Sequence, residues 1–189
     1  MPPERFYDDV LQLWKQTKTG YTPTLIVGYG GNWGENYWYM KTNVWEDERL
    51  TTFVPRRILD ARSRRRVMVP ENEHNHFNNA RIAKELFDKG VSIQLGAHGQ
   101  REGLAAHWEI WMFQQGGMTP LQALRAATTV AADLIEVDDR GRLAPGLYAD
   151  VIAVPGNPLE DITRTEQVVF VMKGGQVARD DVAGASTGG

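Results

Sequence analysis

Two short apolar runs, separated by a helical pattern, constrain the fold of this chain more than any other feature. Residues 21–27 and 91–95 each have the pattern of a buried strand, and Gly96 ends the second one. A helix is predicted between them over about residues 73–89, with Gly90 just past its end. Strands that alternate with helices form parallel βαβ units. The two runs are therefore predicted to belong to one parallel sheet.

Three further helices are predicted from apolar residues at helical spacing. They cover about residues 3–18, about residues 103–115, and a segment that begins at Thr119 and continues through Ala131. Thr119-Pro-Leu-Gln122 is a capping box with proline at the first helical position, so the start of the third helix is well marked.

After about residue 134 the pattern becomes β-rich. Residues 148–154 and 167–172 are predicted strands, and Lys173-Gly174-Gly175-Gln176 has the composition of a tight hairpin turn. The small polar residues 183–189 are predicted to form a disordered tail. The chain is thus expected to hold an α/β part and a smaller β part. Two strands cannot close a barrel, since a complete (β/α)₈ barrel needs about 250 residues.

A glycine- and aromatic-rich stretch, residues 28–45, is too long for a simple connection, and such loops are usually functional. We expect its aromatic side chains to form an apolar wall or lid for a substrate, or else to pack against a domain upstream. Residues 28–34 lack the G-x-G-x-x-G spacing, so no nucleotide site is expected. The aromatic residues are Trp33, Tyr37, Trp38 and Tyr39.

Composition excludes some classes of site and leaves others open. With zero cysteines the chain has no disulfides and no thiolate metal ligands. The net charge of -3 gives no reason to expect nucleic acid, and six arginines between residues 56 and 66 are interpreted as a solvated face. No apolar run approaches the ~20 residues of a membrane span, and no signal core follows Met1, so no membrane partner is expected and the compartment is left open.

Four motifs in order carry a resemblance to a known family. Residues 116–128 read GGMTPLQALRAAT, residues 141–152 read GRLAPGLYADVI, and Asn157-Pro-Leu-Glu-Asp161 and residues 171–177 follow. This order resembles the amidohydrolase superfamily, in its imidazolonepropionase-like or prolidase-like branch, over roughly residues 75–180. Asp150 in the second motif is interpreted as structural, accepting hydrogen bonds from turn amides.

The resemblance implies a fold and a position within it. Residues 1–134 would be the C-terminal part of a metal-dependent hydrolase (β/α)₈ barrel, with residues 21–27 as strand 7 and residues 91–95 as strand 8. Residues 135–182 would be a segment of a small β-sandwich that other parts of the chain complete. Strands 1–6, which hold most of the family's metal ligands, are expected upstream of this sequence.

The resemblance also implies chemistry. Members of the family hydrolyse amide, lactam or dipeptide C–N bonds with water activated by one or two divalent metals, most often zinc. A small amide or peptide is the expected substrate, and the missing barrel segment is the expected partner. The alternative is a non-catalytic fragment or accessory module that lacks most metal ligands. In either case apolar surface that strands 1–6 should cover is expected to cause aggregation or homo-oligomers.

Within the chain only the strand-8 position matches a family ligand. The family has Gly-Thr-Asp there, whereas this sequence has Gly96-Ala97-His98, so His98 is the candidate metal ligand or catalytic base. Histidine lacks the charge of a carboxylate, which leaves the metal count and the proton-transfer scheme open. Further candidates for substrate contacts are His76, His107, Tyr29 and Trp33.

Two apparent motifs are set aside. His74-Asn-His76 resembles the family's His-x-His but precedes the wrong strand, and His74 is expected to point away from His76. His107 and Glu109 lie two residues apart on a predicted helix, so they are not expected to face each other as an acid–base pair.

Overall fold

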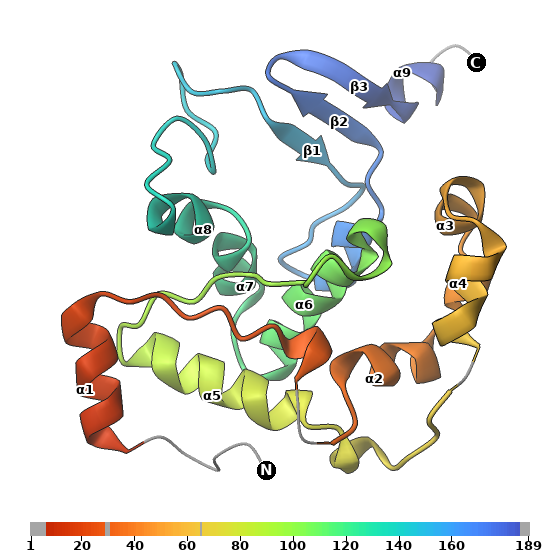
Figure 1. The fold of residues 1–189 in the computed structure, drawn as a ribbon. Helices are drawn as coiled ribbons and strands as arrows, with labels where there is room; N and C mark the ends of the chain where they lie inside the picture. Colours follow the sequence, from red (N-terminus) through yellow and green to blue (C-terminus); the bar gives the residue numbers. More distant parts are fainter. Residues whose placement is uncertain (1–6, 29–30, 65, 186–189) are drawn as a thin grey trace.

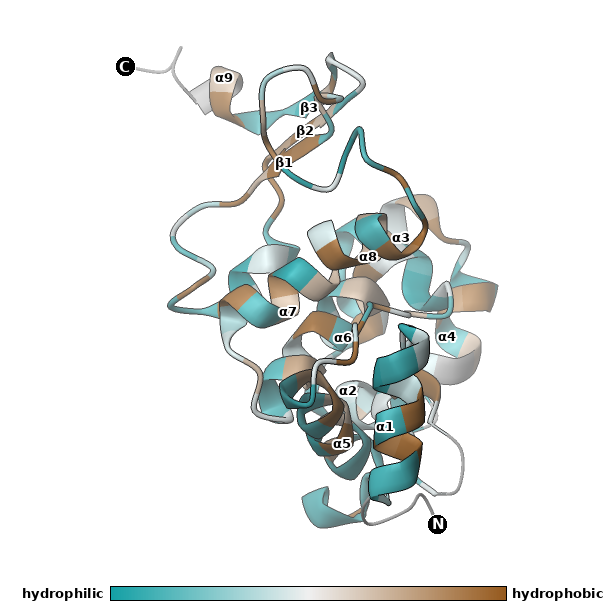
Figure 2. Cartoon of the chain, turned by 90° about the vertical axis from the view of Figure 1, so that its left-hand side faces the viewer, coloured by the Kyte–Doolittle hydropathy of each residue, from teal (hydrophilic) through white to brown (hydrophobic). Residues whose placement is uncertain are grey.

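The computed structural model describes residues 7–28, 31–64 and 66–185 (Figure 1). Helices form most of it, and a three-stranded sheet lies at one end, beyond α7 and α8 (Figures 1 and 2). The chain is therefore mixed α/β and rich in helix. No helix in the described part of the chain is both long enough and apolar enough to cross a bilayer.

The helices follow one another in short segments. The α-helices are α1 (Asp8–Thr17), α2 (Gly34–Lys41), α3 (Glu48–Phe53), α4 (Arg56–Ser63), α5 (His76–Asp88), α6 (Leu104–Gln115), α7 (Pro120–Ala126), α8 (Thr129–Leu134) and α9 (Asp181–Ala185). Short 3-10 segments are η1 (Leu25–Val27), η2 (Val44–Glu46), η3 (Glu71–Glu73), η4 (Gln100–Gly103) and η5 (Ile162–Glu166).

The C-terminal sheet is antiparallel, in the order β1 (Val151–Ala153), β2 (Phe170–Lys173), β3 (Gln176–Asp180). Both predicted β runs are confirmed, and so is the hairpin turn at residues 173–176, which joins β2 to β3. Gly174 and Gly175 have φ of 56° and 80°, a left-handed pair suited to glycine in a tight hairpin. The last helix, α9, carries the chain three residues into the segment that we expected to be a disordered tail, and residues 186–189 lie outside the described part.

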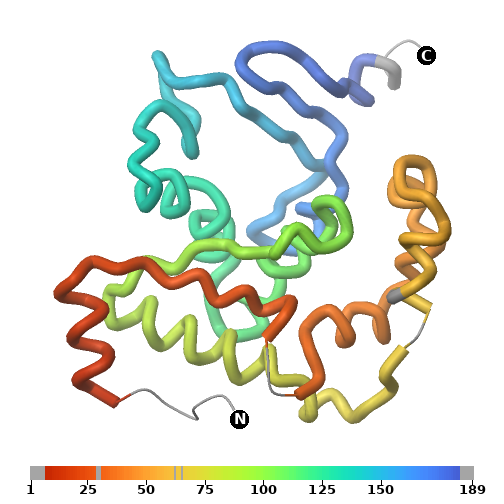
Figure 3. The backbone as a smooth tube through the Cα atoms, viewed as in Figure 1, coloured from red at the N-terminus to blue at the C-terminus, as the bar shows by residue number. Residues whose placement is uncertain are grey.

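The two predicted strands of the α/β part lie side by side and parallel, but they form a single bridge and no extended ladder. Tyr21 pairs with Ile93, its N–H donates to the Ser92 carbonyl at 2.8 Å, and its carbonyl accepts from Gln94 N–H at 3.0 Å. Figure 3 shows the two segments running next to each other. The second half of the first run is the 3-10 turn η1, because Thr24 turns the backbone with φ 48°.

Helices α5 and α6 form the centre of the packing. The sequence predicts both well, and Gly90 past the end of α5 has φ +90° as expected. Helix α6 contacts α5, α7, η1, η4 and η5, so apolar residues cover nearly its whole circumference. Its fully buried side chains include Trp108, Met112 and Phe113.

Two expectations on the helices need correction. The capping box at Thr119 is confirmed, but the helix that follows breaks at Ala127–Thr128, where Thr128 leaves helical φ/ψ, and α8 restarts at Thr129. The loop of residues 141–143 lies against this break, since Thr129 Oγ1 donates to the Gly141 carbonyl at 2.9 Å. The long aromatic stretch is also not one irregular loop, because it contains α2 and η2.

The arginine-rich segment contains α4. Asp60 pairs with Arg56 and Arg64 at 3.7 Å in both cases, and the Arg66 guanidinium lies 4.3 Å from the Trp45 ring centroid. These arginines are largely exposed and partly satisfied by neighbours within the chain.

Candidate functional site

The turn that follows residues 91–95 carries His98 on an unusual backbone. His98 is exposed and has φ +55°, and Arg101 and Glu102 have φ of 52° and 48°. Left-handed backbone is uncommon outside glycine, and such conformations cluster at functional sites where the surrounding fold holds them in place. The turn is therefore a candidate site on backbone geometry as well as on its place in the sequence.

Two contacts hold this turn. A Cβ on Gly96 would lie 2.3 Å from Thr22 Cγ2 and 2.9 Å from Thr24 Oγ1, so only glycine allows the first run to approach so closely. At the other end, buried Arg101 donates to the Tyr39 hydroxyl and lies 3.6 Å from the Glu35 carboxylate. A buried ion pair is costly to break, so it fixes the turn against α2.

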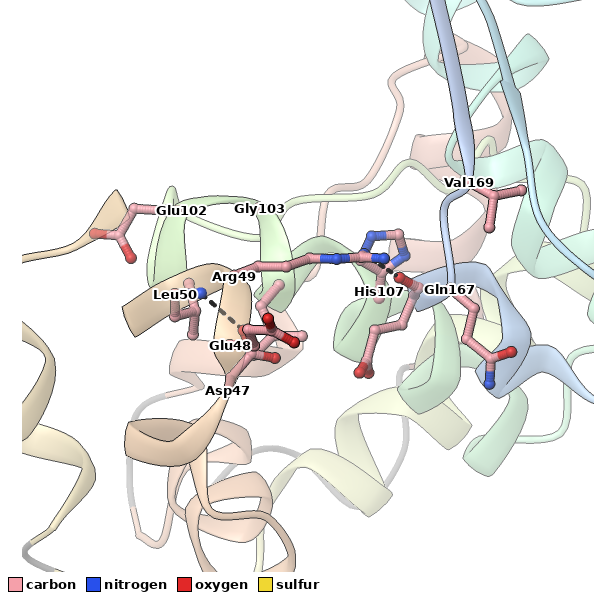
Figure 4. A pocket seen from close by; sticks show the side chains of 11 residues that line it. Asp47, Glu48, Arg49, Leu50, Glu102, Gly103, His107, Gln167 and Val169 are labelled. Carbon is pink, nitrogen blue, oxygen red and sulfur yellow. Dashed lines mark hydrogen bonds between the residues drawn. The ribbon is translucent and has the colours of Figure 1, made fainter. Parts of the chain in front are cut away.

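A pocket of about 470 Å³ opens beside this turn and is lined by His107 (Figure 4). The Arg49 guanidinium reaches across it and donates to the carbonyls of Glu166, at 2.8 Å, and Val168, at 3.1 Å. The pocket thus lies where α3, the start of α6 and the segment after η5 meet. Its lining residues are Asp47, Glu48, Arg49, Leu50, Glu102, Gly103, Leu104, His107, Glu166, Gln167 and Val169.

His107 lines this pocket with an unused ring nitrogen. Its Nδ1 is buried and has no hydrogen-bond partner among the described residues. Burial, and then the nearby Arg49 charge, lower the pKa of His107, so its neutral form is favoured. Burial and the Asp47 charge raise the pKa of Glu166 on the same wall. A neutral imidazole in such a pocket can donate or accept a hydrogen bond from a polar ligand.

His76 lies in the packing between α5, α2 and α6 and does not line the pocket beside the turn. It is 1% exposed, its Nε2 donates to Gln115 Oε1 at 3.1 Å, and its ring lies 4.8 Å from that of Tyr37. Burial lowers its pKa to about 4. His74 was expected to point away, but it is buried too, 6.0 Å from His76 between ring centroids, because it precedes α5 and does not follow helical geometry.

The remaining predicted residues lie on the aromatic stretch. Trp33 immediately precedes α2 and is 38% exposed, whereas Tyr37 and Tyr39 are buried in the core. Trp38 stacks on Trp108 with 5.8 Å between ring centroids. Tyr29 lies outside the described residues. The structure thus brings part of the expected aromatic wall into the core and does not gather the predicted site residues into one pocket.

Glu109, which the sequence analysis considered only as a partner of His107 and set aside, is a further candidate. It is fully buried in α6, and its two carboxylate oxygens accept hydrogen bonds from Leu25 N–H at 2.8 Å and Ile26 N–H at 3.0 Å. Burial raises its pKa to about 8, although the two amides lower it. The available signal was a carboxylate inside the apolar run Trp108–Phe113, and strongly shifted groups of this kind mark functional sites more often than average.

The described residues do not provide a metal site by themselves. Among them no group of three or more histidine and carboxylate side chains is arranged to hold a metal ion. His98 offers one nitrogen at an exposed turn, and a zinc or similar site needs three or four protein ligands. Any metal at this turn would need ligands from outside the described residues.

Comparison with known proteins assigns the chain to a family. A profile of the Amidohydrolase family matches residues 36–178. Ochratoxinase from Aspergillus niger is 40% identical over 93 residues, which are 47% of this chain and 19% of that protein.

Solved structures show the same fold. The crystal structure of A. niger ochratoxinase matches with a TM-score of 0.60 at 25% identity, over 94% of this chain and 36% of that one. A Xaa-Pro dipeptidase with bound methionine in its active site matches with a TM-score of 0.61 at 23% identity, over 90% of this chain and 37% of that one. The chain thus spans well under half the length of these relatives. It belongs to the amidohydrolase family, as the motifs at residues 116–177 indicated.

Proposed function

We propose that this chain is the C-terminal part of a metal-dependent amidohydrolase that cleaves amide, lactam or dipeptide C–N bonds. Membership of the family supports a hydrolase acting on amide or peptide bonds, and superfamily members are typically metal-dependent. In this proposal His98 is the chain's metal ligand or catalytic base, and the other ligands belong to segments that the relatives possess beyond the matched part.

The observation that carries the proposal is the parallel bridge between Tyr21 and Ile93. Parallel neighbours end at the same edge, so the turn with His98 and the turn η1 leave the pair on one side. In (β/α)₈ barrels that edge is the catalytic face. His98 and the exposed Trp33 therefore lie on segments that would face a substrate, and His107 lines the pocket beside the same turn.

We also propose how the chain divides into domains. We assign residues 1–134 to the last two β/α units of a barrel, residues 135–182 to a β-sandwich segment, and residues 183–189 to a tail. The exposure of the β1–β2–β3 sheet supports the β-sandwich assignment. Ile152 and Val177 are more than half exposed, and in a sandwich a second sheet would cover such apolar side chains. Zinc, one or two ions, is the expected metal of the longer protein.

A second candidate is a non-catalytic module. It is favoured by one observation, namely that the described residues hold no three-ligand metal cluster. In that case the chain would bind its partner segment but would not turn over a substrate.

The test compares the 189-residue chain with a longer polypeptide that includes the coding sequence upstream. Each is dialysed with zinc, its bound zinc is measured, and hydrolysis of an N-acyl amino acid and of an X-Pro dipeptide is assayed. We expect no stoichiometric zinc and no turnover with the chain alone, and both with the longer protein. Zinc-dependent turnover by the chain alone would refute the need for outside ligands.

His98→Ala in the longer protein tests the site itself. We expect a loss of turnover of roughly a hundredfold or more, the size typical of a lost acid–base or ligand group. Asp150→Asn is the control, because Asp150 lies in the C-terminal sheet, where it accepts the Gly174 amide and lies 3.9 Å from the Arg140 guanidinium. Full activity of the His98 variant, or absence of activity in the unaltered longer protein, would favour the non-catalytic reading.

A further inference from the structure

The carboxylate of Glu109 is buried without a counter-charge. No cation pairs with it among the described residues, and both oxygens are used by the adjacent amides of Leu25 and Ile26. A buried carboxyl group costs several kcal/mol of free energy unless it is well hydrogen-bonded. An apolar residue would fill this part of α6 at less cost, so the carboxylate calls for a role beyond packing.

The amides that Glu109 binds belong to the backbone turn that leaves the first predicted strand. Thr24 has φ +48°, and Leu25 and Ile26 follow it in η1 with no exposed surface. With its amides bound by Glu109, the chain cannot continue as a strand beside residues 91–95. Glu109 therefore stabilises the 3-10 turn η1 in place of a longer parallel pairing with residues 91–95.

The same turn lies directly against the segment of His98. Thr22 and Thr24 close the space at Gly96, where a Cβ would approach Thr22 Cγ2 to 2.3 Å. Gly96 precedes His98 by two residues, so a shift of Thr24 moves the backbone that carries His98. Close packing of this kind transmits displacements, because no free volume absorbs them.

We propose that Glu109 is a positioning residue, whose carboxylate sets the Thr24–Ile26 backbone and, through Gly96, the turn that carries His98. The inference rests on the role proposed above for His98. Glu109 also reaches α2 by the same route, since a Cβ on Gly34 would lie 2.5 Å from the Leu25 carbonyl.

The two hydrogen bonds need an ionised carboxyl group. Two neighbouring amides require two acceptor oxygens, and a protonated carboxyl or a glutamine amide offers one good acceptor and a competing donor. Burial raises the pKa of Glu109 to about 8. Above that pH the ionised carboxylate accepts hydrogen bonds from both amides, and below it the protonated group leaves one amide without its hydrogen bond. The turn should respond to pH through this group.

Other titratable groups on the packed elements must be told apart from Glu109. Tyr21 senses the Glu109 charge, but burial and that charge raise its pKa further above the range of Glu109. His76 on α5 titrates near 4. The other charged or titratable groups on the packed elements are Glu35, Tyr37, Tyr39 and Lys41 on α2, Arg81, Lys84, Glu85 and Asp88 on α5, Arg101 and Glu102 on η4, His98 in the turn before it, His107 on α6, Arg125 on α7, and Arg164 and Glu166 on η5.

The test is an NMR titration of backbone amides in the full chain from about pH 6 to about pH 10, around the shifted carboxyl pKa. We expect Leu25, Ile26, Gly96 and His98 to share one midpoint. Glu109→Gln should abolish that midpoint at all four and speed amide exchange at Leu25 and Ile26 roughly tenfold or more, the loss of a charged hydrogen bond. Glu136→Gln, at an exposed glutamate, is the control and should leave the shared midpoint in place.

Two outcomes would overturn the inference. One is a midpoint at Leu25 and Ile26 that Gly96 and His98 do not share, which would make Glu109 a local support of η1 alone. The other comes from a second variant, Glu109→Asp, for the case that the glutamine variant does not fold. Aspartate keeps the negative charge, but its side chain is one methylene shorter. Unchanged shifts at Gly96 and His98 in that variant would also refute it. These shifts do not depend on hydrolysis, so failure of the proposed function would leave them readable.

Discussion

The α5–α6 packing and the C-terminal sheet differ in what their residues do. The sheet lies at one end of the molecule, and Leu143, Tyr148 and Ile152 around it are each more than half exposed. In α6, by contrast, Trp108, Glu109 and Met112 have almost no exposed surface. The family motifs at residues 141–177 lie in or beside the sheet, whereas His76, His107 and Glu109, whose pKa values are shifted mainly by burial, lie on α5 and α6. Recognisable sequence and candidate chemistry thus occupy different parts of this chain.

The difference has a physical cause. Turn motifs such as Pro145-Gly146 and the Lys173–Gln176 hairpin specify local backbone, so they are readable wherever they stand. Buried ionisable groups depend on partners far away in sequence, as Glu109 does on Leu25 and Ile26. Such partners leave no local pattern.

The largest expected effect is on stability at the centre of α6. Trp108→Ala should lower the free energy of unfolding by about 3–5 kcal/mol, because it removes a fully buried ring that stacks on Trp38. Leu143→Ala is the control beside the sheet. With 76% of Leu143 exposed, it should change stability by less than about 0.5 kcal/mol. Urea denaturation measures both, and equal losses would erase the contrast between the two regions.

The next effect is the pH dependence set by His76. Its folded pKa of about 4 lies below the unfolded value of 6.5, so the unfolded chain binds more protons between these pH values. Stability should therefore fall as pH drops from 6.5 to 4, by up to about 3 kcal/mol from this group.

His76→Phe, which keeps a ring beside Tyr37 but cannot ionise, should lose this part of the slope. Carboxyl groups titrate in both proteins, so the difference between the two curves isolates His76. If the free energy of unfolding depends on pH in the same way in both proteins, the prediction is wrong, and His76 must be open to solvent before unfolding.

The smallest effect belongs to the sheet. Asp150 Oδ1 accepts the Gly174 N–H at 2.7 Å, as expected for a structural residue of the motif. Asp150→Ala should cost about 1 kcal/mol of unfolding free energy, because it removes this hydrogen bond, while the half-exposed ion pair with Arg140 at 3.9 Å contributes little. Amide exchange at Gly174 should rise while that of Leu25 and Ile26 stays unchanged. A simultaneous change at η1 would mean that the two regions are coupled.

Much of the local structure could be predicted. The bounds of α5 and α6, the capping box at Thr119 and the β2–β3 hairpin follow from helical spacing and turn residues. The family followed from motifs of the same local kind. The α2 helix was missed because its aromatic residues give no amphipathic pattern. Tyr37 and Tyr39 are both buried, and Trp38, which lies between them in the sequence, packs on Trp108.

By itself, the sequence determined the positions of α5, α6 and the β2–β3 hairpin, which family the chain belongs to, and that His98 follows the second apolar run. Only the tertiary structure decided that this run meets the first in a single parallel bridge, that His76 is buried, and that Glu109 binds the Leu25 and Ile26 amides. The reason is that propensity and turn chemistry act between near neighbours in sequence. Burial and buried hydrogen bonds depend on contacts between segments that are distant along the chain.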